Sequence, residues 1–475
     1  MKLIKNMGLS TVYQLLSLIV PLITAPYVSR VLGSTGVGIN AFTASILSYF
    51  TLFAGLGIQI YGNREIAYHQ NNVRERTKIF WELQIIQTIS TLISIVVFLI
   101  FLIFQSKYQI FFLIQGISLF TVMANISWFF MGLENFQIIV FRNTLINLIV
   151  VILTFLLVRK YSDLWIYILL LVGANLLANL SVWPFLKKEI CKISIRDLDI
   201  KKHMGPVLIL LLPQIAATAY VNINKTMLGW LDSTSGVGYF NQADMIIRTA
   251  FTAVSSFASA FLPRLSNLFS ENKIEEGKNL IRTALQIMFT LSILAIAGIL
   301  GVSNNFATFF FGEKFQAVGP LMAVEAFVIF FFGIANVIRS QYLMAIRHTR
   351  EITVAALIAL IVNIIINLIM IPRWGVMGAT ITVLITEGLT TAYLVWAVRK
   401  DFDLVILFQG FWKYIIAGIV AFGGTYYLNN NLNPSIISYI IQAFGGIITY
   451  SIMIFILKAP ILKLFKDFKK SKRSI

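Results

Sequence analysis

Apolar runs of about twenty residues recur along the whole chain, separated by short polar segments. A run of roughly 20 mostly apolar residues is long enough to cross a bilayer as a helix. The runs predict fourteen spans, near 9–31, 37–62, 79–104, 109–132, 136–158, 164–186, 205–231, 236–262, 280–304, 317–346, 352–372, 375–398, 407–428 and 435–457. We therefore predict an all-α membrane protein with about 14 transmembrane helices.

The distribution of Lys and Arg along the loops predicts the orientation of these spans. Cytosolic loops carry an excess of basic residues. With the N-terminus in the cytosol, 27 of the 38 Lys and Arg residues fall in cytosolic segments, 5 fall on the opposite side and 6 lie at membrane depth. This asymmetry predicts that both termini are cytosolic and that the number of spans is even.

The composition places the chain outside the range of soluble proteins. Of its 475 residues 58% are hydrophobic and only 12% are charged, whereas soluble domains carry about 25% charged residues. The net charge of +18 does not indicate nucleic acid, because the basic residues lie in short loops between apolar runs. The single cysteine, Cys191, excludes an internal disulfide. The first apolar run continues past Tyr27 without a cleavage site, so we interpret it as a retained span.

A short internal repeat predicts two related lobes. Residues 32–38 (LGSTGVG) follow the first span, and residues 231–238 (LDSTSGVG) follow the seventh. Because each lobe has an even number of spans, six, both lobes begin on the same side of the membrane. The axis that relates them is therefore expected to run along the membrane normal. The predicted organisation is a first lobe at 1–186, a cytosolic linker at 187–204, a second lobe at 205–400, and two further spans with a basic tail at 401–475.

Six basic side chains are predicted to lie at membrane depth: Arg30, Arg142, Lys225, Arg248, Arg339 and Lys413. Each costs roughly 2.5–3.5 kcal/mol on insertion scales. Repeated acceptance of this cost indicates a wet, positively charged interior that suits an anionic substrate. Two alternatives stay open, since Arg30 is close enough to a span end to snorkel to the interface and Lys413 is placed as an ordinary anchor.

Polar side chains at helical spacing extend these positions. One polar stripe in the seventh span is formed by Gln214, Thr218, Asn222 and Lys225. In the eighth span an ion pair at i and i+4 is possible between Asp244 and Arg248. In the tenth span one helix face carries Glu325, Asn336 and Arg339. Asn125 in span four and Glu387 in span twelve complete the candidates. The acids Asp244, Glu325 and Glu387 are candidates for binding a coupling ion. The competing interpretation is that such side chains only hydrogen-bond neighbouring helices.

The sequence lacks the signatures of an enzyme. His69, His203 and His348 fall in or beside cytosolic loops and do not have the spacing of metal ligands. A glycine-rich phosphate loop ending in Lys-Ser or Lys-Thr does not occur, which argues against ATP hydrolysis. We expect a transporter without a cofactor or metal.

Several motifs resemble Wzx-type polysaccharide repeat-unit flippases. They are 21–33 (PLITAPYVSRVLG), 61–67 (YGNREIA), 128–134 (WFFMGLE) with Arg142 following, 225–229 (KTMLG), 262–266 (LPRLS), and 363–372 with 374–379 (WGVMGA). The similarity extends over essentially the whole chain. Two positions depart from the family pattern: Asn224 stands where many relatives have Asp, and Met131 stands where Gln is common.

The resemblance implies a member of the multidrug/oligosaccharidyl-lipid/polysaccharide exporter superfamily, with two six-helix lobes in a V and two further helices. It implies alternating-access transfer of undecaprenyl-diphosphate-linked oligosaccharide across a bacterial cytoplasmic membrane, with polysaccharide polymerase machinery as a partner. The expected contacts to diphosphate and sugar are Arg30, Arg142, Lys225, Arg248, Arg339, Gln214, Asn222, Asn125 and Asn336.

Three other functions are weighed against this one. A multidrug exporter of the same superfamily predicts an acidic cavity, which the basic excess opposes. A flippase for peptidoglycan precursor is a close variant that fits the same residues. A membrane-bound polymerase or ligase predicts a large outward loop, whereas every outward loop here is short.

Overall fold

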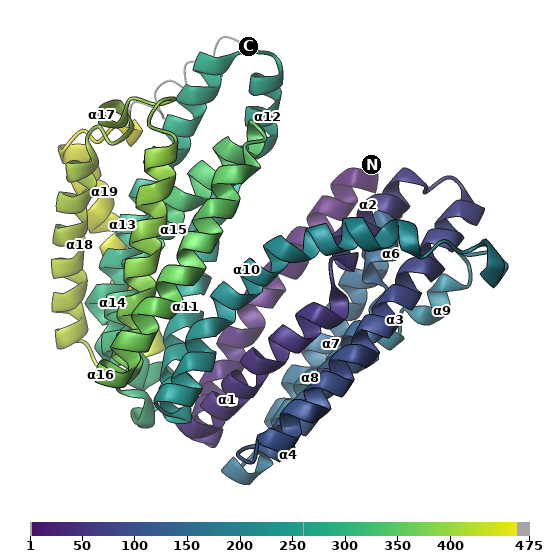
Figure 1. Cartoon of the computed structure of the whole chain (residues 1–475). Coiled ribbons are helices and arrows are strands. Elements are labelled where there is room, and N and C mark those ends of the chain that lie inside the picture. The colour runs from purple at the N-terminus through teal and green to yellow at the C-terminus, as the bar shows by residue number, and fades with distance from the viewer. Residues whose placement is uncertain (1, 260, 463–475) are drawn as a thin grey trace. The chain divides into compact units, whose positions relative to one another are not determined.

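The computed structural model describes residues 2–259 and 261–462, so the predicted basic tail from residue 463 lies outside the described residues. Every regular element in the described part of the chain is helical, and that part contains no strand (Figure 1). Among the described residues, eleven helices are long and apolar enough to cross a membrane, or twelve if α11 and α12 form one bent span. The prediction of an all-α, multi-pass membrane protein is confirmed.

Backbone contacts divide the chain into two compact units, Met1–Gly238 and Tyr239–Ile475. The helices of the first unit are α1 (Lys2–Gly55), α2 (Ile58–Tyr68), α3 (Val73–Phe104), α4 (Gln109–Gln115), α5 (Ile117–Met123), α6 (Ser127–Gly132), α7 (Phe136–Leu157), η1 (Tyr161–Asp163), α8 (Leu164–Leu180), α9 (Trp183–Leu186), η2 (Ile195–Asp197), α10 (Lys201–Leu231) and the start of α11 (Thr234–Ser259). The predicted lobe borders at 186 and 205 stay a prediction.

The second unit contains the rest of α11 and the remaining helices. These are α12 (Leu262–Ser270), α13 (Ile274–Phe311), η3 (Glu313–Phe315), α14 (Val318–Glu325), α15 (Val328–Asn336), the π-helix η4 (Val337–Leu343), α16 (Thr349–Ala397), α17 (Leu404–Leu407), α18 (Phe411–Asn431) and α19 (Ile436–Ile456).

Two of these helices, α1 and α16, are broken at a glycine. Gly33 (φ 67°, ψ 179°) interrupts α1, and Gly375 (φ 54°, ψ −132°) interrupts α16. Glycine accepts a positive φ because it has no Cβ. At about 1.5 Å per residue, helices of 54 and 49 residues far exceed the roughly 30 Å of a hydrocarbon core. Each therefore has the length for two crossings, as the predicted fourteen spans require.

Aromatic side chains form the centre of each unit's core. In the first unit the fully buried ring of Phe80 packs against Trp128 and Phe129, at centroid distances of 5.7 and 5.3 Å. In the second unit Phe289 contacts Phe411 at 5.1 Å, and α13 thereby packs against α18. Burial of such large rings is a major source of packing energy between helices.

The two copies of the internal repeat contact each other inside the first unit. The Thr35 and Ser235 hydroxyl oxygens are 2.7 Å apart. A Cβ added at Gly38 would lie 1.6 Å from the Thr234 carbonyl oxygen, and one added at Gly238 would lie 2.0 Å from the Ser34 carbonyl oxygen. The contacts are reciprocal, as they are across a two-fold axis, and both glycines are required for the close backbone approach.

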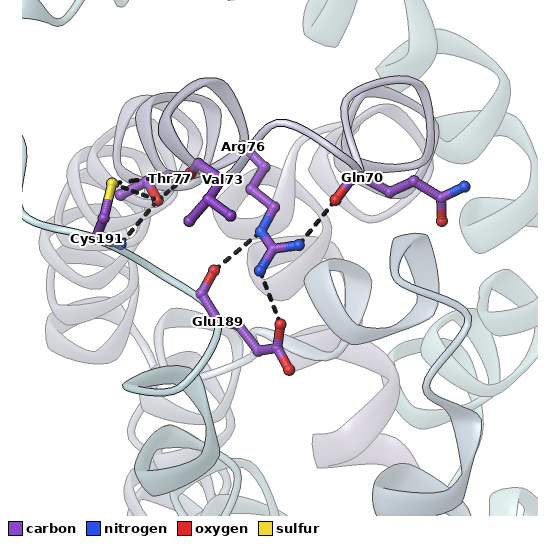
Figure 2. Close-up of polar contacts among 6 residues, drawn as sticks. All are labelled: Gln70, Val73, Arg76, Thr77, Glu189 and Cys191. Atoms are coloured by element: carbon purple, nitrogen blue, oxygen red, sulfur yellow. Dashed lines mark hydrogen bonds and ion pairs between the residues drawn. The ribbon is translucent and has the colours of Figure 1, made fainter.

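The predicted cytosolic linker is tied to the start of α3 (Figure 2). Arg76 donates from Nε to the Glu189 carbonyl at 2.9 Å and pairs through Nη2 with the Glu189 carboxylate at 2.9 Å. Its Nη1 donates to the Gln70 carbonyl at 2.8 Å. The backbone N–H of Cys191 donates to the Thr77 hydroxyl at 3.1 Å. The linker is thus held as ordered backbone against α3, and Cys191 takes part through its main chain.

A buried carboxylate also joins α3 to the start of α10. Glu82 is 0% exposed and accepts from His203 Nε2 at 2.7 Å and from the Asp199 N–H at 2.6 Å. Lys202 Nζ lies 3.2 Å from the same carboxylate, and the Tyr61 hydroxyl contacts His203 Nδ1 at 2.8 Å. His203, predicted to lie in or beside a cytosolic loop, lies in the first turn of α10 and is buried there by its contact with Glu82.

Candidate functional site

The predicted fourth span is broken within the first unit. Helix α5 ends at Met123 and α6 begins at Ser127, which leaves Ala124–Ile126 outside regular helix. Carbonyls released in an apolar environment must find donors. Four side chains from other helices supply them: Asn179 to Thr121 O (2.9 Å), Gln87 to Val122 O and to Asn125 O (3.2 Å), Gln84 to Met123 O (2.8 Å) and Trp183 to Ala124 O (2.9 Å). The break is therefore a regular part of the fold, stabilised by hydrogen bonds to its carbonyl groups.

A polar cavity of about 240 Å³ lies beside this break. Its wall is formed by one arginine, amide and hydroxyl side chains, and a few apolar residues from α2, α6, α7 and α8 together with the α5–α6 connection. The lining residues are Gln59, Asn125, Ser127, Met131, Ile139, Arg142, Asn143, Ile146, Asn147, Asn175, Ala178 and Asn179. Two of the predicted site residues, Arg142 and Asn125, thus share one cavity.

Arg142 organises one side of the cavity. Its Nε and Nη2 donate to the Asn143 side-chain oxygen at 2.9 and 2.7 Å. Its Nη1 donates to the Ala178 carbonyl at 3.1 Å and to the Asn179 side-chain oxygen at 3.4 Å. The guanidinium therefore bridges α7 to α8, and it adds positive charge to one wall of the cavity.

Asn125 lines the cavity from the connection between α5 and α6. Its Nδ2 donates to Gln59 Oε1 at 3.3 Å, and its Oδ1 accepts from the Ser127 N–H at 3.0 Å. The second bond satisfies the first N–H of α6, a group that has no partner within the helix. Asn125 therefore holds the helix break and presents part of its amide to the cavity.

The other predicted residues of the first unit lie outside this cavity. Gln214 and Asn222, on α10, each donate to the carbonyl one turn earlier, Leu210 O at 3.1 Å and Thr218 O at 3.0 Å. Lys225 is half-buried on the same helix, and Arg30 is exposed on α1 just before the Gly33 break. Each of these two amide nitrogens thus donates within its own helix, whereas the competing interpretation expects bonds to neighbouring helices.

In the second unit the structure forms the predicted i, i+4 pair. Arg248 Nε lies 2.5 Å from Asp244 Oδ1, and the buried Glu325 is close enough to act on the same guanidinium. Arg339 is half-buried in the π-helix η4 and makes no ion pair with any residue that the structure describes. A π-helix turn often marks a functional position.

The remaining candidates of the second unit, Asn336 and Glu387, lie on α15 and on the second half of α16. Asn336 is half-buried at the end of α15, directly before η4. Glu387 is 5% exposed and follows the buried Thr386, whose hydroxyl accepts a weak hydrogen bond from Asn363 at 3.5 Å.

A second cavity, of about 490 Å³, lies in the second unit and is apolar. Its wall is built mainly from α11, α13, α18 and α19, with small residues such as Ala250, Gly298 and Gly446 and with Phe257 and Phe306. Such a lining suits a hydrocarbon chain, because it offers apolar contact and few hydrogen-bonding groups.

Sequence reasoning missed Asn143 and Asn147, which line the polar cavity from α7, one turn apart. Asn175 and Asn179 line the same cavity from α8, also one turn apart. The repeated i, i+4 amides on adjacent spans were a signal, together with Arg142 one residue before Asn143. Gln59 carried no such signal, because its contact with Asn125 depends on the break in span four.

The helical architecture and the polar cavity within apolar spans define a multi-pass membrane transporter. The family described as polysaccharide biosynthesis protein matches residues 3–269, and the chain belongs to this family. This match and the relatives below confirm the resemblance to Wzx-type flippases.

Curated relatives carry transporter and flippase names. One, named "Putative O-antigen transporter", from Escherichia coli (strain K12), is 24% identical over 398 residues, which are 82% of this chain and 94% of the relative. Another of the same name, from Shigella dysenteriae, is 22% identical over 80% of this chain and 96% of the relative.

Solved structures share the fold. "Lipid II flippase MurJ, inward closed conformation" superposes with a TM-score of 0.75 at 17% identity, covering 93% of this chain and 97% of that one. An inward-facing multidrug transporter of the MATE family gives a TM-score of 0.62 at 15% identity, with 82% and 94% covered. At these identities the likeness concerns the fold alone.

Proposed function

We propose that this protein is a flippase that transfers undecaprenyl-diphosphate-linked oligosaccharide from the inner to the outer leaflet of the bacterial cytoplasmic membrane. The observation that carries the proposal is the arginine- and amide-lined cavity within helices that are otherwise apolar, in a chain of the polysaccharide biosynthesis family. A polar headgroup crosses hydrocarbon only at a large free-energy cost, and a polar path through the protein removes that cost.

The proposal assigns the parts of the substrate to different side chains. Arg30, Lys225, Arg248 and Arg339 would neutralise the diphosphate, since Arg and Lys bind phosphate oxygens through charge-assisted hydrogen bonds. The apolar cavity of the second unit supports the proposal that part of the polyprenyl chain binds there. Asp244 already offsets the charge of Arg248, so we expect Arg339 to contribute more to phosphate binding than Arg248 does.

Fourteen crossings, both termini in the cytosol and two six-helix lobes belong to the same proposal. They are supported by the length of α1 and α16 and by the basic excess in the segments assigned to the cytosol.

The membrane potential is the proposed driving force. In a cell that is negative inside, outward movement of an anionic group is favoured by about 2.3 kcal/mol per charge per 100 mV. Movement of the cavity cations with the substrate would cancel part of this gain. Dissipating the potential should therefore slow export, and an unchanged rate would reject this part of the proposal.

A deletion strain tests the function in the cell. Loss of this protein should abolish surface polysaccharide and leave lipid-linked repeat units on the cytosolic face, and the wild-type chain should restore export. Normal polymer in the deletion strain, or a change only in drug sensitivity, would overturn the proposal in favour of another member of the superfamily.

A further inference from the structure

We infer that the polar cavity beside α6 is a subsite for one uncharged sugar residue of the lipid-linked substrate, and that it does not bind the diphosphate. This inference rests on the proposed function and narrows it. The sequence assigned Arg142 to the diphosphate; the geometry of the cavity assigns it a different task.

The guanidinium of Arg142 is engaged by protein acceptors on all three nitrogens. Nε and Nη2 both donate to Asn143 Oδ1, and Nη1 donates to Ala178 O and Asn179 Oδ1. A bidentate grip on phosphate needs two parallel N–H groups directed at the ligand. Here these groups are directed at the protein, so Arg142 orients the amides of α7 and α8 around the cavity.

The amide groups facing the cavity offer both donors and acceptors. Within the described residues the Asn147 side chain has no hydrogen-bond partner, and neither do Asn143 Nδ2 and Asn175 Oδ1. Sugar hydroxyls both donate and accept, which matches this mixture. An anion would find exposed amide oxygens that repel it, and a cation would meet the Arg142 charge. The chemistry therefore favours a neutral, polyhydroxylated ligand.

The size and the apolar part of the wall fit one sugar ring. Small-molecule pockets run from about 300 to 1,000 Å³, so a cavity of about 240 Å³ suits a single ring better than an oligosaccharide. Ile139, Ile146 and Met131 line the same cavity, and they offer contact to the C–H face of a pyranose. Hydroxyl groups would then meet the amides while the ring face packs on the aliphatic side chains.

The test compares two lipids on the purified full chain in nanodiscs. The probes are undecaprenyl diphosphate without sugar and undecaprenyl diphosphate carrying one N-acetylhexosamine. Asn147→Leu keeps the approximate volume and removes the amide. Because the variant loses the hydrogen bonds of one amide, we expect roughly 2- to 10-fold weaker binding of the sugar-bearing lipid and unchanged binding of the bare lipid. Thr144→Val, on the same helix but outside the cavity lining, is the matched control and should change neither affinity.

Each outcome decides the question. If Asn147→Leu loses affinity only for the sugar-bearing lipid, the result supports the subsite. An equal loss of affinity for both lipids, or no loss of affinity, overturns it. Failure of the wild-type chain to bind either lipid overturns the proposed function itself. If Asn147→Leu unfolds, as judged by its thermal transition, Asn175→Ala removes another amide oxygen that faces the same cavity without a partner among the described residues, and its result is interpreted in the same way.

Discussion

Substitution of Gly38 by alanine should force apart the contact between the two copies of the repeat. The added Cβ would lie 1.6 Å from the Thr234 carbonyl oxygen, while Cβ atoms essentially never approach another heavy atom closer than 3.0 Å. The obstructing atom belongs to the backbone and cannot rotate away. The two segments must therefore separate by at least about 1.4 Å at this point.

The size of the effect follows from this displacement. Separation by that amount would lengthen the 2.7 Å contact between the Thr35 and Ser235 hydroxyls beyond hydrogen-bonding distance. Overpacking typically costs 1–3 kcal/mol, and the lost hydrogen bond adds about 0.5–1.5 kcal/mol. Together these terms amount to about 1.5–4.5 kcal/mol, which lowers the population of the closed contact by roughly 10- to 2,000-fold. In a variant that lacks both hydroxyls, the overpacking term acts alone.

Disulfide trapping measures this population directly. With Cys191 replaced by serine, the pair Thr35→Cys and Ser235→Cys should cross-link rapidly in membranes under mild oxidation. Addition of Gly38→Ala should slow the cross-linking. Gly173→Ala is the control, because a Cβ at Gly173 on α8 meets nothing within 4 Å and alanine favours helix. Equal cross-linking rates in the Gly38 and Gly173 variants would refute the reasoning.

Two further predictions concern buried charge. Glu82→Leu leaves three donors without their acceptor and should lower the free energy of unfolding by about 3–5 kcal/mol, which is measured as a lower thermal midpoint and faster proteolysis of 187–204. The control Glu75→Gln, at a half-exposed position, should have little effect. Equal thermal midpoints for the two variants would contradict the role assigned to Glu82. Lys225→Ala and Arg339→Ala should each abolish surface polymer while the protein stays in the membrane. Lys413→Ala is the control and should leave the polymer unchanged, because Lys413 donates to the Lys458 carbonyl just after the end of a helix. Normal polymer in the first two variants would remove these residues from the proposed site.

The helices could be predicted from the sequence because the thickness of the hydrocarbon core sets the length of an apolar run. The pairing of Asp244 with Arg248 could also be predicted, since both residues lie on one helix and the spacing alone brings them together. The repeat itself could be recognised from its matching glycines. These features depend on local geometry or on similarity within the chain.

The features that could not be predicted depend on partners far apart in the sequence. The break before α6 is stable only because Gln84, Asn179 and Trp183 donate to its carbonyls. His203 is buried because Glu82 accepts its hydrogen bond. Asparagines in spans commonly bond to neighbouring helices, so Asn143 and Asn147 could be assigned to a cavity only once α7 and α8 were placed side by side.

The most direct test of the flippase proposal is a reconstituted transfer assay. The purified chain is placed in liposomes whose inner leaflet contains undecaprenyl-diphosphate-linked oligosaccharide, and the sugar that reaches the outer leaflet is detected with a membrane-impermeant enzyme. We predict rapid, protein-dependent transfer that is faster with an inside-negative potential and lost in Lys225→Ala. Transfer at the rate of protein-free liposomes would contradict the proposal.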